Sequence, residues 1–201
     1  MTDYTITKLD ISSKNLYLLP NDISKYTNLQ ILFCNNNTII HLDNLPQRLK
    51  VLKCQHNYVS KLNNLPLTLK ELYCSTNNIK SFTNLPPTLE VLDCSNNQLS
   101  FNSLDNLPPT LKILNCSYNN MVELYVENTR LQGINFSDNE LECFPNLPDT
   151  VKMLKCYGNK FDEIRGYNLP KNINLKWSIL YKDNPDETEA DTDREASDCD
   201  Y

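Results

Sequence analysis

Apolar residues recur along this chain at a long, nearly constant spacing. The pattern Leu-x-x-Leu-x-Cys-x-x-Asn-x-apolar starts at Leu49, again at Leu69 and again at Leu89. A period close to 20 residues is typical of stacked repeats, in which each turn contacts only its neighbours. The second leucine position recurs at steps of 20 to 23 residues as Leu9, Leu32, Leu52, Leu72, Leu92, Leu114, Ile134 and Leu154, and Leu175 opens a degenerate ninth turn.

Each column of this pattern predicts a local structure. The residues around the second leucine alternate between core and outside, which indicates a short strand that pairs in parallel with the next turn. The asparagine column is expected to be structural, because its amides suit backbone groups left unpaired where the chain leaves each strand. Six Asn-Leu-Pro segments predict a return path of extended backbone and turns without helices. They are 44–46, 64–66, 84–86, 106–108, 146–148 and 168–170.

The repeat resembles a known family. The run from Leu45 and Pro46 through Leu49, Leu52 and Cys54 to Asn57 resembles the short leucine-rich repeats of bacterial secreted effectors. It resembles still more the Asn- and Cys-rich repeat proteins of giant DNA viruses. The resemblance covers residues 6–177 and implies a mainly β leucine-rich repeat solenoid, with a short-stranded parallel sheet on the concave face and an extended, turn-rich convex side. It also implies protein binding, without the ubiquitin-ligase domain that follows the repeats in some bacterial members.

Charge divides the chain into two predicted parts. Residues 182–201 contain nine acids and two bases. The whole chain has 25 acids and 19 bases, which leaves 16 and 17 in residues 1–181. We therefore predict a nearly neutral repeat domain at 1–181, with a C-terminal cap near 173–181, and an acidic disordered tail at 182–201. Such a tail is also a candidate to fold back over a basic edge of the domain.

The cysteines are predicted to fill the core. Six of the eight occupy one column, and no Cys-x-x-Cys pair is present to suggest a metal site. Side chains on successive parallel strands point the same way and do not converge on an ion. The two histidines, His41 and His56, have no neighbours that suggest a catalytic triad, and the three glycines are too scattered for a phosphate loop. We therefore expect no metal, no cofactor, no small-molecule substrate and no enzymatic activity.

A partner-binding surface can be assigned from the strand alternation. Ile31, Phe33, Val51 and Tyr73 are expected to form an exposed apolar and aromatic cluster on the concave face, as protein interfaces often do. Ordinary packing along a strand face is the alternative, because such residues favour strands in any case. The full set of candidate contact residues is Ile31, Phe33, Val51, Lys53, Tyr73, Asp93, Lys155 and Tyr157.

These features favour a non-catalytic protein-interaction scaffold. A second column, which includes Lys50, Lys70, Glu90 and Lys112, gives one edge a mild positive charge, but a near-neutral body does not favour nucleic acid. No signal peptide or apolar span is visible, so we expect no membrane contact and a cytoplasmic location, in a host if the protein is viral. The alternatives are the substrate-recognition arm of a ubiquitin-ligase assembly and a structural component of a virion.

Overall fold

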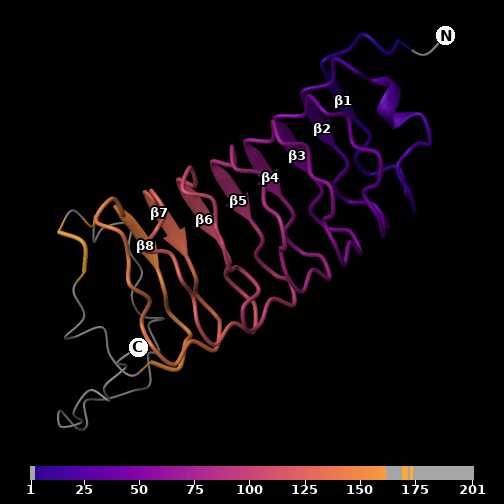
Figure 1. The fold of residues 1–201 in the computed structure, drawn as a ribbon. Helices are drawn as coiled ribbons and strands as arrows, with labels where there is room; N and C mark the ends of the chain where they lie inside the picture. The colour runs from indigo at the N-terminus through magenta and orange to yellow at the C-terminus, as the bar shows by residue number, and fades with distance from the viewer. Residues whose placement is uncertain (1–2, 162–168, 172, 174–201) are drawn as a thin grey trace, which may run out of the picture.

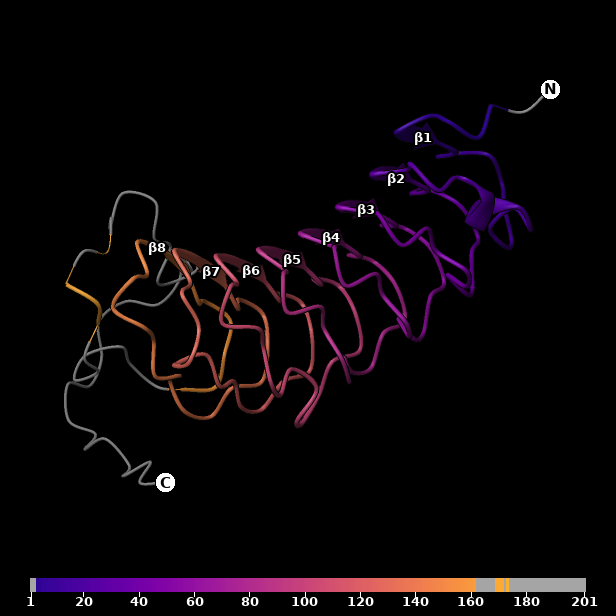
Figure 2. The same cartoon turned by 45° about the horizontal axis from the view of Figure 1, so that its top comes forward.

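The computed structural model describes residues 3–161, 169–171 and 173, and in them the chain winds into a solenoid. Eight strands pair in sequence order into one parallel sheet, which lines the inner side of a shallow arc (Figures 1 and 2). The strands are β1 (Lys8–Asp10), β2 (Ile31–Phe33), β3 (Val51–Lys53), β4 (Glu71–Tyr73), β5 (Val91–Asp93), β6 (Ile113–Asn115), β7 (Gly133–Asn135) and β8 (Met153–Lys155).

The register of the sheet follows the predicted repeat. The second leucine of each turn lies at the centre of a strand and pairs with its counterpart in the next turn, as Leu32 does with Leu52 and Leu52 with Leu72. Because side chains alternate along a strand, the central leucine points into the core and its two neighbours line the concave face. The predicted mainly β solenoid, with its parallel sheet, is confirmed.

The core is a set of columns that run the length of the arc. Leu52, Cys54 and Val59 are fully buried, and their counterparts in the neighbouring turns are buried in the same way. A single turn is too thin to bury its own apolar side chains. Stacked turns cover one another's apolar side chains and keep water away from them. The six column cysteines are free and buried among these side chains, which confirms their predicted role as core residues.

The asparagine column ties each turn to the one before it. The Asn57 amide nitrogen donates to the carbonyl oxygens of Cys34, at 3.1 Å, and Cys54, at 3.0 Å. Its Oδ1 accepts from the backbone N–H of Ile39 at 2.9 Å. The side chain thus satisfies backbone groups on both sides of a turn boundary, and the prediction of a structural role is confirmed.

The return path is extended and turn-rich, as predicted, with one departure in the described part of the chain. Ile23–Lys25 form a single 3-10 turn, η1, in the first and longest step of the repeat. The residue before each column asparagine has a positive φ, as His56 (54°) and Thr76 (55°) do. This left-handed residue redirects the chain out of each strand.

The predicted cap at 173–181 and the acidic tail at 182–201 lie outside the described residues, except for Ile173. Over the part that the structure covers, no helix is long and apolar enough to span a bilayer.

Candidate functional site

Three side chains stand next to one another on the concave face of β2, β3 and β4. Phe33 pairs in register with Lys53, and Lys53 with Tyr73. The Lys53 ammonium lies 5.0 Å from the centroid of the Phe33 ring and 5.0 Å from that of the Tyr73 ring. On the other side of Phe33, Lys8 Nζ lies 4.8 Å from the same ring centroid. These distances are those of cation–π contacts, which hold a lysine close to the sheet without neutralising its charge.

Tyr73 is held in place from its own strand. Its hydroxyl donates a hydrogen bond to Glu71 Oε2 at 3.1 Å. Partial burial raises the pKa of Tyr73, and the hydrogen bond and the charge of Glu71 raise it further. The phenol therefore stays protonated at physiological pH and keeps the rotamer in which its ring faces Lys53.

An open hollow of about 440 Å³ begins beside this row of side chains. Gln55 Oε1 is buried there and accepts no hydrogen bond from the described residues. His56, at the rim, is exposed and has a φ of 54°. The hollow is open to solvent, so a side chain of another protein could enter it from the concave side. It is lined by Asp10, Ser12, Phe33, Asn35, Lys53, Gln55, His56 and Ser75.

The structure brings together most, but not all, of the predicted contact residues. Ile31, Phe33, Val51, Lys53 and Tyr73 lie on three adjacent strands, and Asp93 follows on β5. Lys155 and Tyr157 belong to the last strand and the loop after it, four strands beyond Tyr73, and form no continuous surface with that group.

The predicted exposure of the apolar cluster was wrong in degree. Ile31, Phe33, Val51 and Tyr73 are all half-buried. Strand spacing in a parallel sheet is about 4.8 Å, so large side chains in register cover one another's flanks. Only the outer parts of these rings and branches are available to a partner.

A second polar group lies near the C-terminal end of the concave face. A hydrogen bond with Asp138 raises the pKa of Tyr118, and the nearby charges of Asp138 and Tyr157 act in the same direction. A Cβ at Gly158 would lie 2.6 Å from Asp138 Oδ1, so the missing side chain there leaves room for the carboxylate. Tyr118 and Asp138 are not among the predicted contact residues, although both have the positive φ of the residue before a column asparagine.

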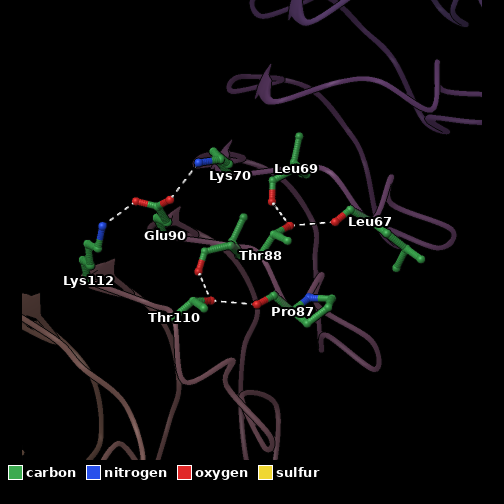
Figure 3. A network of polar contacts seen from close by, with 9 residues as sticks. Leu67, Leu69, Lys70, Pro87, Thr88, Glu90, Thr110 and Lys112 are labelled. Carbon is green, nitrogen blue, oxygen red and sulfur yellow. Dashed lines mark hydrogen bonds and ion pairs between the residues drawn. The ribbon is translucent and has the colours of Figure 1, made fainter.

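The predicted basic edge is interrupted by an acidic residue (Figure 3). Glu90 accepts from Lys70 at 3.2 Å and from Lys112 at 2.6 Å. The hydrogen bonds from Lys112 and Lys70 hold the pKa of Glu90 below its usual value, so it stays ionised at neutral pH. The single carboxylate of Glu90 therefore offsets one of the two positive charges of Lys70 and Lys112, and the three residues keep a net charge of +1.

Potential metal ligands lie apart in the described residues, and the thiols of the cysteine column are buried. In residues 3–161, 169–171 and 173, no three His, Cys, Asp or Glu side chains come together as metal ligands. Burial raises the pKa of the Cys34 and Cys156 thiols to about 12, far from the range of a catalytic thiolate. Both thiols are therefore protonated at neutral pH and lie in the core beneath the concave face.

Comparisons with known proteins agree with this fold. No family model and no curated protein sequence matches the chain. Among solved structures, it is similar to the leucine-rich repeat domain of a Shigella effector, with 27% identity over 78% of this chain and 71% of that one, at a TM-score of 0.70. It is similar to YopM, a leucine-rich effector protein from Yersinia pestis, with 28% identity over 85% of this chain and a TM-score of 0.74. YopM from Yersinia enterocolitica WA-314 has 25% identity over 90% of this chain, at a TM-score of 0.68.

The lengths of the matched proteins differ from that of this chain. The chain spans 47% of the Yersinia pestis structure and 43% of the Yersinia enterocolitica one. The likeness therefore concerns the repeat fold with its turns of about 20 residues, as the sequence predicted. The resemblance to viral repeat proteins stays a prediction.

Proposed function

We propose that this leucine-rich repeat protein is a non-catalytic interaction module that binds a protein partner through the N-terminal half of its concave face. The observation that carries the proposal is the Lys53 ammonium between the rings of Phe33 and Tyr73, beside an open hollow. Tyrosine is among the residue types that most often dominate the binding energy of protein interfaces, and phenylalanine is enriched at their centres.

The backbone beneath these side chains makes them a favourable contact surface. Each lies on a strand that pairs on both sides, so little backbone freedom is lost when a partner binds. The rings also restrict the rotamers of Lys53 before binding. A suitable partner would place a carboxylate near the Lys53 ammonium and apolar groups against the exposed edges of the two rings.

Affinity capture with quantitative mass spectrometry tests the proposal. The full chain and a Phe33→Ala, Tyr73→Ala double variant are used to capture proteins from a cytosolic lysate. The expected result is a partner that the wild type retains and the double variant loses. Thermal unfolding of both proteins checks that the variant still folds.

A matched control comes from aromatic residues away from the strands. Phe101 and Tyr125 are 63% and 55% exposed, and a Phe101→Ala, Tyr125→Ala variant removes the same ring types from the return path. It should capture the partner as the wild type does. Equal capture by all three proteins, or equal loss in both variants, would contradict a site on the N-terminal concave face.

A further inference from the structure

The outer edge of β1 has backbone groups that the rest of the sheet does not use. The Thr7 carbonyl accepts from Gln30 at 2.8 Å, and the Ile11 N–H donates to the Phe33 carbonyl at 2.8 Å. Backbone groups alternate in direction along a strand, so residues 7, 9 and 11 face β2 and residues 8 and 10 face away from it. Lys8 and Asp10 therefore present their N–H and C=O groups at the open edge of the sheet.

The apolar end of the solenoid is also incompletely covered. Leu9, Ile11 and Leu16 are half-buried, whereas their counterparts one turn later, Leu32, Cys34 and Ile39, are fully buried. The difference arises because the first turn has a neighbour on one side only among the described residues. Covering this end would extend the burial that stabilises every later turn.

The side chains of β1 carry opposite charges on the two sides of Leu9. Lys8 and Asp10 are both exposed and flank Leu9. In an antiparallel pair centred on Leu9, Lys8 of each copy stands opposite Asp10 of the other. We propose that β1 is a dimerisation edge, at which a second copy of this chain pairs antiparallel to the first about a twofold axis through Leu9.

The geometry of strand pairing supports this arrangement. Directly opposite residues in an antiparallel pair point to the same face, so both Lys8–Asp10 pairs lie on the concave side and both Leu9 side chains on the core side. Residues 8 and 10 would exchange both of their backbone hydrogen bonds. An isologous contact of this kind closes at two copies and cannot propagate into a fibre.

Charged residues at a sheet edge also have a simpler explanation, since they often prevent edge pairing. That role is best served by charges of one sign, which repel in every register. β1 instead carries one charge of each sign at positions that attract in the centred register. The opposite charges of Lys8 and Asp10 therefore favour one specific antiparallel pairing, rather than the prevention of all pairing at this edge.

The dimer would place the two candidate contact surfaces side by side. Asp10 and Phe33 line the concave hollow, and both lie within one strand of the proposed axis. The inference does not depend on the proposed partner, since the oligomeric state is measured on the protein alone.

Sedimentation velocity of the full chain over a range of micromolar concentrations tests the proposal. The wild type should reach twice the chain mass of 23.3 kDa. Asp10→Lys leaves Lys8 opposite a lysine, and Lys8→Asp leaves Asp10 opposite an aspartate, so each variant alone should dimerise at least about tenfold more weakly. An equimolar mixture of the two restores opposite charges and should form a heterodimer.

The mixture also keeps the test independent of any effect on folding, because a misfolded variant could not regain the dimer in it. The Lys8→Asp, Asp10→Lys double variant should dimerise as the wild type does. A wild type that stays monomeric over this range would overturn the proposal. So would single variants that dimerise normally, or a mixture that stays monomeric.

Discussion

The side-chain amide of Asn77 donates a hydrogen bond to the carbonyl oxygen of Cys54, in the preceding turn, at 3.0 Å. It also donates to Cys74 O at 3.1 Å, and its Oδ1 accepts from the Val59 N–H at 2.9 Å. One side chain therefore replaces water for several backbone groups that lie in two turns. Such a bond network makes adjacent turns unfold together rather than one at a time.

Replacing this asparagine should be costly. Asn77→Ala leaves buried carbonyl and N–H groups without partners, so we expect the free energy of unfolding to fall by about 3 kcal/mol. Urea denaturation followed by circular dichroism measures the change. Asn78→Ala, next in the chain, is the control, because no hydrogen bond of the Asn78 side chain is found in the described part. Its free energy of unfolding should stay within about 0.5 kcal/mol of the wild-type value. Equal losses in the two variants would contradict the structural role of the column.

Much of this architecture could be read from the sequence because each column has one physical task. The leucine column has to be buried, and the asparagine column has to satisfy backbone groups. The residue type at each position of the repeat therefore indicates where that residue lies in the turn. The position of Lys53 between two rings could not be predicted in the same way. It depends on the rotamers that neighbouring side chains of different size adopt on a curved sheet, and the repeat period does not determine these rotamers.

Other features had a signal that the sequence analysis did not use. Thr68, Thr88 and Thr110 each precede the first leucine of a turn, and Thr150 precedes Val151 at the same position. Each donates to a backbone carbonyl of the preceding turn. The short 3-10 turn at Ile23–Lys25 coincides with the longest step of the repeat. In contrast, the separation of Lys155 and Tyr157 from the other candidate residues follows directly from strand order.

The left-handed column allows a stabilising substitution. Thr76 is exposed and has a φ of 55°, a region that is unfavourable for a β-branched residue. Asparagine tolerates this region better, and it occupies the same column at Asn36 and Asn96. We expect Thr76→Asn to increase the free energy of unfolding by about 0.5 to 1 kcal/mol.

Chemical denaturation compares Thr76→Asn with Thr83→Asn, at an exposed position outside the positive-φ column. The second substitution should be close to neutral. A loss of stability at position 76, or the same gain at both positions, would show that backbone strain at Thr76 is not the cause.

The threonine column contributes a second set of bonds between turns. Thr88 Oγ1 lies 2.7 Å from the Leu67 carbonyl oxygen and 2.8 Å from that of Leu69, to which it can donate (Figure 3). Thr88→Val keeps the shape of the side chain and removes the donor, so we expect a loss of about 1 kcal/mol in the free energy of unfolding. Thr83→Val, whose exposed hydroxyl makes no described hydrogen bond, should change it by less than about 0.5 kcal/mol. If both valine variants are equally stable, the hydroxyl of Thr88 does not couple the turns.

Alkaline pH should destabilise the protein through its buried thiols. Burial raises the pKa of Cys34 and Cys156 to about 12, and that of Cys74 well above its ordinary value of 9.0. Above pH 9 the unfolded chain releases these protons while the folded chain retains them. The contribution of these thiols to the free energy of unfolding is therefore fully present below the ordinary thiol pKa and is lost as pH rises toward 12. Each such thiol contributes a slope of up to about 1.4 kcal/mol per pH unit.

Tyrosines also ionise in this range, so the thiol contribution has to be isolated by difference. Cys74→Ala lowers the stability at neutral pH because it leaves a cavity, but it also removes one titrating thiol. The free energy of unfolding, measured by urea denaturation between pH 8 and pH 10.5, should fall less steeply for this variant than for the wild type. The difference in slope should approach about 1.4 kcal/mol per pH unit, because a fully buried thiol remains protonated throughout this range. Parallel pH profiles for the two proteins would mean that the Cys74 thiol is accessible to base in the folded state, in conflict with its place in the core.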